Sequence, residues 1–242
     1  MDAIDGCLQG ESHADGDAMT MPDPGCVVKV GDGRGFIIEH RFKVPRHNLP
    51  RRLKLRLRTF MENRVVVTAA HCLPKLPLAH AGSFRRERTW KLLGTLGGRT
   101  TGIWAECLFV NPVADIAVLG RPDDQEPFYE AEEYDRLTGD VRPLRIGTAR
   151  SGPGCVLSLR GRWVRTRLEL FGSVDGGASL SVDPTEPGMS GSPILNDAAK
   201  AIGLISVGSE TVGASGERKN VRCGPQPILA RDLPGWLIPL SR

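Results

Sequence analysis

Short apolar runs recur along the chain, and glycine or proline separates most of them. The 242 residues include 29 glycines and 18 prolines, whereas only 5% of the residues are aromatic. Short runs rich in valine and isoleucine predict strands joined by turns, and no repeat of about 20–50 residues suggests a solenoid or propeller. We therefore predict an all-β fold in two halves that join near residues 120–140. The runs are CVVKV, FIIEH, RVVVT, WKLLG, IWAECLFV and DIAVL in the first half, and VRPLRIG, CVLSLRGRWV, RTRLELFG, ASLSVD, SPILN and AIGLISVG in the second.

Composition divides the chain into four predicted segments. Residues 1–24 form a polar, acidic leader, and residues 25–120 form the first half. The acidic residues 121–140 are predicted to be a linker, as a loop or short helix, and residues 141–242 form the second half with a short C-terminal helix. The leader has no hydrophobic segment of the kind that directs secretion, and no apolar run approaches the roughly 18 residues of a membrane span. We therefore expect a cytoplasmic protein with no membrane span.

Charge and cysteine content exclude several function classes. The formal net charge of +4 is too small to indicate a nucleic-acid partner by itself, so nucleic-acid binding is disfavoured. The six cysteines lie far apart and form no CxxC pair, which argues against a zinc site; we expect no metal and no cofactor. Without an export signal, free thiols are favoured over disulfides.

A basic insertion lies between the apolar runs FIIEH and RVVVT, at about residues 40–64. It has nine lysines and arginines and one acidic residue between Arg41 and Arg64. One interpretation is a long hairpin whose cations are simply solvated. The other is an exosite for an acidic substrate, a regulatory protein or nucleic acid. The scarcity of aromatic residues disfavours stacking on a single nucleic-acid strand.

Three short motifs carry the candidate chemistry. TAAHC places His71 just after a buried strand, VADIAVL places Asp115 where another begins, and PGMSGSP places Ser190 in a glycine-rich turn. Each motif is weak alone, but a serine hydroxyl needs an adjacent base in order to attack at neutral pH, and the base needs a negative partner. Histidine titrates near neutral pH and can supply the base.

The order His, Asp, Ser and these three motifs resemble those of the chymotrypsin-like or trypsin-like serine proteases. The resemblance covers about residues 26–236, and GMSGSP is similar to the motif of the bacterial HtrA-like and V8-like branches. It implies two antiparallel six-stranded β-barrels with the active site in the cleft between them. His71 and Asp115 would come from the first barrel and Ser190 from the second, as the catalytic triad of a serine endopeptidase that works through an acyl-enzyme intermediate.

The same resemblance assigns further residues. The backbone N–H groups of Gly188 and Ser190 would form the oxyanion hole. Ser206 matches the serine that usually donates a hydrogen bond to the catalytic aspartate. Thr185, Ser206, Val207 and Gly208 would line the specificity pocket and the edge strand that pairs with the substrate backbone.

The chain departs from the digestive members of this family in several places. Met189 replaces the aspartate that pairs with a new N-terminus after activation, so we expect no such processing. Cys72 has no partner cysteine near GDGRG, where Cys26 is the nearest candidate. Pro184 occupies the usual specificity position, and the lack of an acid there argues against simple trypsin-like choice of arginine or lysine. Asp183 is one residue away, however, and a small loop shift could bring it into the pocket. Ile205 replaces a histidine that helps V8-like enzymes to recognise glutamate.

The sequence leaves three functions to compare. We expect a bacterial endopeptidase acting on a protein or peptide substrate, with a regulatory protein partner as a weaker expectation. The alternative is a catalytically silent protease fold that binds a partner through the basic insertion, but such a module has no chemical reason to keep His71, Asp115, Ser190 and Gly188. A third alternative is an esterase or acyl transferase that uses the same triad.

Overall fold

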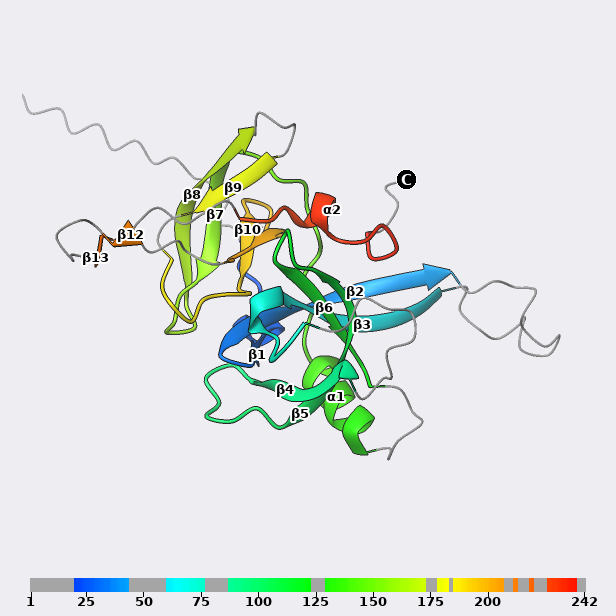
Figure 1. The fold of residues 1–242 in the computed structure, drawn as a ribbon. Helices are drawn as coiled ribbons and strands as arrows, with labels where there is room; N and C mark the ends of the chain where they lie inside the picture. The colour runs from blue at the N-terminus through cyan, green and yellow to red at the C-terminus, as the bar shows by residue number, and fades with distance from the viewer. Residues whose placement is uncertain are drawn as a thin grey trace, which may run out of the picture.

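The computed structural model describes residues 20–43, 60–76, 87–122, 129–172, 178–182, 185–206, 211–212, 218–219 and 226–238 (Figure 1). Strands are the main secondary structure of the described chain, as the alternation of apolar runs and turns predicts. The strands are β1 (Val27–Val30), β2 (Gly33–Lys43), β3 (Phe60–Ala69), β4 (Thr89–Thr95), β5 (Ile103–Asn111), β6 (Ile116–Gly120), β7 (Gly152–Leu157), β8 (Trp163–Gly172), β9 (Ala178–Val182), β10 (Pro193–Asn196), β11 (Ala201–Leu204), β12 (Thr211–Val212) and β13 (Arg218–Lys219). The helices are α1 (Tyr129–Gly139) and α2 (Leu229–Asp232), with 3₁₀ turns η1 (Pro24–Cys26) and η3 (Ala70–Cys72).

The first half is a closed antiparallel barrel of six strands, in the order β1-β2-β3-β6-β5-β4. Its strands carry the β-branched runs, and Val65, Val66 and Val67 of β3 are almost completely buried. Strands β2 and β3 stay paired from Gly35 opposite Thr68 to Lys43 opposite Phe60. The basic insertion therefore begins on these paired strands, while its residues 44–59 lie outside the described residues.

The second half contains an antiparallel sheet in the order β11-β10-β7-β8-β9. The two edge strands of this sheet are joined by a later segment. Gln226 bridges to Leu180 of β9, and Ile228 bridges to Gly203 of β11. The segment 226–228 thus occupies the place of a sixth strand and closes the sheet into a barrel-like structure. Its core is formed around Val156, Leu168, Leu180, Val182, Met189, Ile194, Ile202, Ile205 and Ile228.

A short connection joins the two barrels. Leu144 bridges to Ile38 of the first barrel, and two residues later Ile146 bridges to Ala201 of the second. The run VRPLRIG, predicted as a strand, is therefore present only as these two bridges. The acidic linker contributes α1, which packs beside β5 in Figure 1. The hydroxyl of Tyr134 on α1 donates a hydrogen bond to the carbonyl of Arg64 on β3 (3.0 Å).

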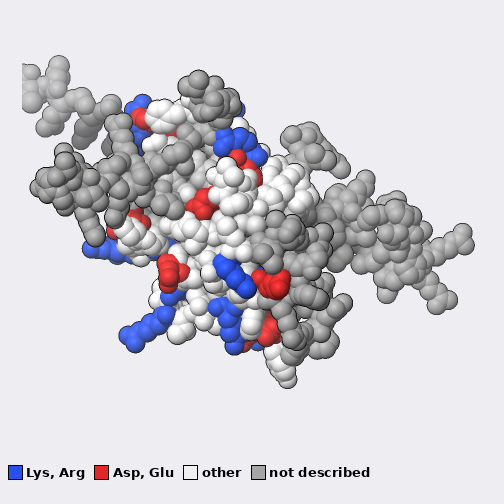
Figure 2. Space-filling view, in the orientation of Figure 1, with Lys and Arg blue, Asp and Glu red and all other residues white. Residues whose placement is uncertain are grey.

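The outer surface of the described residues carries both signs of charge. Figure 2 shows acidic and basic side chains interspersed with uncharged ones on the face seen in Figure 1. Among the described residues, no helix is long and apolar enough to cross a membrane. The sequence prediction of an all-β, double-barrel architecture is confirmed, with a described second barrel that depends on the segment 226–228 for its closure.

Candidate active site

His71 lies immediately after β3, in the 3₁₀ turn η3. Strand β3 is held in the first barrel by its pairing with β2 and β6. The small residues Ala69 and Ala70 let the chain turn closely at the end of this strand, and the Ala70 N–H donates a hydrogen bond to the Asp115 carbonyl (3.1 Å). This backbone contact fixes the turn that carries His71 against the loop that carries Asp115.

Asp115 is joined to His71 by two further hydrogen bonds. The His71 backbone N–H donates to Asp115 Oδ1 (2.9 Å), and His71 Nδ1 lies 2.7 Å from Asp115 Oδ2. Asp115 has a left-handed backbone (φ 53°), which aspartate tolerates better than most residues. The preceding loop is held by Asn111, whose side-chain oxygen accepts from the N–H groups of Val113 and Ala114 (3.1 Å each). Both carboxylate oxygens of Asp115 are therefore directed at His71.

Ser206 also donates its hydroxyl to Asp115 Oδ2. This is the contact that the family resemblance implies for Ser206. The backbone N–H of Ser206 in turn donates to the side-chain oxygen of Gln226, a residue only 1% exposed. Gln226 was missed by sequence reasoning, because a glutamine between two prolines gives no local sign that it is buried. Its position in the closing segment links the second barrel to the Asp115 carboxylate.

Ser190 lies in the second of two consecutive tight turns. The Met189 N–H donates to the Glu186 carbonyl (3.1 Å), and the Ser192 N–H donates to the Met189 carbonyl (2.9 Å). The third residue of each turn is a glycine with positive φ, at 91° for Gly188 and 82° for Gly191. Such turns require a residue without a Cβ at this place, which explains the Gly-x-x-Gly pattern around Ser190.

Met189 anchors these turns in the core of the second barrel. Its side chain is 2% exposed and packs among the apolar residues of that core. The position that carries an aspartate in the digestive proteases is therefore filled by an apolar side chain. The packing of Met189 therefore supports the turn around Ser190. Backbone hydrogen bonds also hold this turn, such as that from the Gly191 N–H to the Ile205 carbonyl (2.6 Å).

Arg34 on β2 holds the turn of Ser190 from the first barrel. Its N–H donates to the Ser190 carbonyl (2.8 Å), and its own carbonyl lies so close to Gly191 that a Cβ there would be 1.8 Å away. The Arg34 side chain is buried and donates from one guanidinium nitrogen to the carbonyls of Leu157 and Ser158 (3.0 Å each). Burial lowers the pKa of this guanidinium, while the nearby Glu186 raises it. Sequence reasoning missed Arg34, because GDGRG indicates only a turn.

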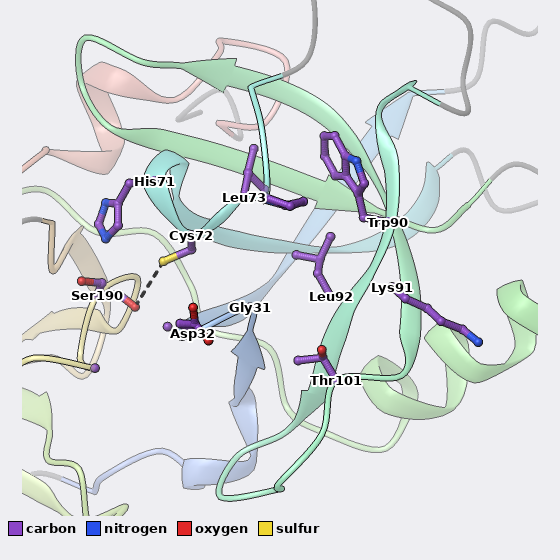
Figure 3. Close-up of a pocket in the computed structure, with 13 residues that line it drawn as sticks. Gly31, Asp32, His71, Cys72, Leu73, Trp90, Lys91, Leu92, Thr101 and Ser190 are labelled. Atoms are coloured by element: carbon purple, nitrogen blue, oxygen red, sulfur yellow. Dashed lines mark hydrogen bonds between the residues drawn. The ribbon is translucent and has the colours of Figure 1, made fainter.

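A pocket of about 400 Å³ contains both His71 and Ser190 in its lining (Figure 3). His71 and Ser190, both described, form no hydrogen bond with each other. Within the described chain, nothing accepts a hydrogen bond from the N–H of Gly188 or of Ser190, and Gly188 lines the same pocket. The structure thus brings together a histidine–carboxylate pair, a serine and two unused backbone donors.

The predicted specificity residues are only partly described. Thr185 begins the segment that leads into the turns of Ser190 and is half-buried, and Ser206 is placed as above. Neither Thr185 nor Ser206 lines the pocket of Figure 3. Asp183, Pro184, Val207 and Gly208 lie outside the described residues, so the specificity pocket stays a prediction.

Four described cysteines are free and buried. Burial raises the pKa of Cys26 to about 12 and those of Cys72 and Cys107 to about 11. Cys72 and Cys26 are both free, so Cys26 is not the partner of Cys72. The Cys72 sulfur lies 3.8 Å from the Ser190 carbonyl oxygen, and a Cβ on Gly33 would lie 2.5 Å from the sulfur. Cys155 is the fourth, and Cys7 and Cys223 lie outside the described residues.

The strand order, a closed six-stranded barrel beside a second barrel-like sheet, is that of the chymotrypsin-like double barrel. No protein-family model matches the chain, and no curated protein matches it. Several solved structures do.

Solved structures that resemble this chain include several proteases. They include the serine protease of a human pathogenic astrovirus (16% identity, 77% of this chain and 85% of that chain, TM-score 0.40). The HtrA-type protease AlgW with a decapeptide shares 15% identity over 83% of this chain and 60% of the AlgW chain, with a TM-score of 0.41. The MamO protease domain from Magnetospirillum magneticum shares 15% identity over 81% of this chain and 90% of that chain, with a TM-score of 0.42.

Proposed function

We propose that this protein is a serine endopeptidase in which Ser190 is the nucleophile, His71 the general base and Asp115 the residue that orients His71. The observation that carries the proposal is the contact between His71 Nδ1 and Asp115 Oδ2 at 2.7 Å, in a pocket that Ser190 also lines. A carboxylate at Nδ1 holds the proton on that nitrogen and leaves Nε2 free to accept one. Asp115 is itself fixed by the His71 N–H and by Ser206, so the imidazole is held in one orientation.

In the proposed reaction, Ser190 Oγ attacks the carbonyl carbon of the scissile bond as His71 takes the hydroxyl proton. His71 then gives this proton to the leaving amine, and the C–N bond breaks to leave an acyl-enzyme ester on Ser190. A water molecule then attacks the ester while His71 takes its proton. His71 returns the proton to Ser190 Oγ, and the carboxylic acid product is released. Hydrogen bonds between base and nucleophile often tighten only when substrate is bound, which is compatible with the absence of one between His71 and Ser190 here.

The negative oxygen of the tetrahedral intermediate needs preorganised donors. We assign this role to the N–H groups of Gly188 and Ser190, which have no acceptor among the described residues. Loss of one such donor costs about 3 kcal/mol in the transition state. Because Met189 holds the turn through burial rather than through an ion pair, we propose that no N-terminal cleavage is needed to form this site.

The proposal is tested with a fluorophosphonate probe, which labels a serine only when a base activates it. We expect labelling of the wild-type protein and its loss in Ser190→Ala. The matched control is Ser192→Ala, two residues away, because the Ser192 hydroxyl is buried with no hydrogen-bond partner in the described structure. Folded protein that is not labelled at Ser190 would favour the silent binding module over the protease.

A second measurement separates an endopeptidase from an esterase or acyl transferase. A peptide library with an internally quenched fluorophore, digested by the wild-type protein and by Ser190→Ala, reports both peptide cleavage and its sequence preference. We expect cleavage that depends on Ser190 and falls about a million-fold without it. Labelling by the probe without any peptide cleavage would assign the triad to ester chemistry.

A further inference from the structure

The pocket of Figure 3 lies on the first-barrel side of Ser190. It is lined by His71 and the residues that follow it, by the β1–β2 turn and by β4, but not by Ser206 or Thr185. In the proposed mechanism, His71 hands its proton to the leaving group. The part of a substrate that follows the scissile bond would therefore lie over His71, in this pocket, whose volume of about 400 Å³ suits a ligand group.

Two lining residues carry a full charge, Asp32 and Lys91. The Lys91 ammonium lies over the Trp104 ring, 5.7 Å from its centroid, and Figure 3 shows the side chain directed away from the pocket. Asp32 is exposed, and no cation among the described residues pairs with its carboxylate. The net charge that the lining presents to a bound side chain is therefore that of one carboxylate.

Asp32 is held rigidly next to the candidate nucleophile. It occupies a two-residue turn between Val30 and Gly33, which are paired across β1 and β2. A Cβ on Gly31 would lie 2.6 Å from the Cys72 carbonyl, and one on Gly33 would lie 2.8 Å from the Ser190 carbonyl. The turn is thus packed directly against the residues after His71 and against Ser190. The backbone that carries the Asp32 carboxylate is therefore preorganised, which reduces the conformational freedom lost when a ligand binds.

The rest of the wall suits the stem of a long cationic side chain. Leu73 and Leu92 are buried beneath the pocket surface, and the half-buried indole of Trp90 forms its far end in Figure 3. Lysine and arginine bury their methylene groups against apolar surface while the charged end stays near water, and both are attracted to the face of an indole. An acidic side chain in the same place would be repelled by the Asp32 carboxylate.

We propose that Asp32 is a specificity-determining residue and that this pocket selects a lysine or arginine on the leaving-group side of the scissile bond. The inference rests on the proposed serine endopeptidase function, because it takes the acyl-enzyme on Ser190 as given. It concerns the half of the substrate that departs, and is independent of the residue whose carbonyl is attacked.

The test runs the acylation step in reverse: an added amine attacks the acyl-enzyme, so no natural substrate is needed. 4-Nitrophenyl acetate acetylates Ser190, and amino-acid amides then compete with water for the acetyl group. The amine nitrogen bonds to the acetyl carbon, the bond from that carbon to Ser190 Oγ breaks, and the amine proton passes through His71 to Ser190. The probes are lysine amide and norleucine amide, which differ mainly in the ammonium group, and glutamate amide. Mass spectrometry measures each N-acetyl product.

We expect wild-type protein to prefer lysine amide over norleucine amide by about fivefold, the effect of an exposed ion pair, and to use glutamate amide least. Asp32→Asn should remove the preference, and Asp32→Lys should reverse it toward glutamate amide. The release of 4-nitrophenolate, which involves no leaving-group side chain, is measured in every variant so that the amide preferences are compared per acetyl-enzyme formed. Asp140→Asn, at an exposed aspartate outside the pocket lining, is the matched control.

The possible failures are distinguishable. Release of 4-nitrophenolate that depends on Ser190, with equal use of the three amides, would overturn the role of Asp32 alone. A preference for lysine amide that survives in Asp32→Asn would do the same. If no release depends on Ser190, the proposed function fails and this inference fails with it.

Discussion

The backbone N–H of Arg34 donates a hydrogen bond to the carbonyl oxygen of Ser190 at 2.8 Å. Arg34 belongs to β2, which pairs with β3, the strand that precedes the turn of His71. This bond therefore connects the candidate nucleophile to the barrel of its candidate base. The Arg34 side chain extends the connection by binding the carbonyls of Leu157 and Ser158 in the second barrel. One residue therefore controls how the two halves of the site are placed relative to each other.

Replacing Arg34 should weaken both the fold and the site. Arg34→Gln removes the buried guanidinium and leaves two carbonyls short of a donor, at a cost of about 1–3 kcal/mol in the free energy of unfolding. The rate of fluorophosphonate labelling should also fall, because the second barrel loses its side-chain anchor on β2, although the backbone N–H of residue 34 can still donate to the Ser190 carbonyl. Arg34→Lys should recover part of both losses. Urea unfolding and labelling kinetics measure them, and an unchanged labelling rate in Arg34→Gln would contradict the positioning role.

Asp115→Asn should lower the reaction rate about 10⁴-fold while leaving the fold intact, because an amide can stabilise the wrong tautomer of His71. Ser206→Ala should cost much less, about 1.5–3 kcal/mol in the activation free energy, since only one charged hydrogen bond to Asp115 is lost. Labelling rates compared with circular dichroism spectra test both variants. Equal rates for Asp115→Asn and the wild type would remove Asp115 from the mechanism.

Gly191→Ala should prevent Ser190 from reaching its place. A Cβ at this position would lie 1.8 Å from the Arg34 carbonyl, and its φ of 82° is unfavourable for alanine. We expect loss of labelling together with a lower melting temperature. Gly102→Ala is the matched control, because a Cβ there meets nothing within 4 Å and its φ is not in the left-handed region. Similar melting temperatures for the two variants would contradict the packing argument.

The buried thiols should make the protein sensitive to alkali. Burial raises the pKa of Cys72 and Cys107 from 9.0 to about 11, and that of Cys26 to about 12. A pKa that folding raises adds stability below the unfolded value, and this stability is lost as the pH rises through the folded value. The free energy of unfolding should therefore fall as the pH rises from about 9 to about 12. Replacement of Cys26 and Cys107 by alanine should flatten this dependence in urea titrations, whereas an unchanged slope would assign it to other groups.

Much of the fold could be predicted from local sequence, whereas the contact between Ser206 and Asp115 was implied by the family resemblance. A valine run such as 65–67 can be buried only as a strand in a chain with so many turns, and glycines at 188 and 191 mark tight turns. The positions of His71, Asp115 and Ser190 follow from motifs that extend over only a few residues. Such short motifs locate the three residues in the sequence. They do not establish the catalytic roles, which the experiments above test.

Residues that act across long sequence separations could not be predicted. Arg34 contacts residues more than 120 positions away, and a single arginine in a glycine-rich turn gives no sign of burial. Gln226 is buried because it lies between the edges of the second sheet, which depends on closure of that sheet rather than on its neighbours. Asp32 acquires its place beside Ser190 from two glycine contacts that exist only in the folded chain.

Closure of the second barrel by residues 226–228 also has a consequence for the order in which a ribosome makes this protein. His71, Asp115 and Ser190 are all synthesised before Gln226, yet Ser206 receives its backbone partner only when Gln226 arrives. A nascent chain that has reached Ser190 therefore carries every reactive group but an open sheet behind them. Completion of the candidate site therefore waits for a residue that is synthesised after all three candidate catalytic residues.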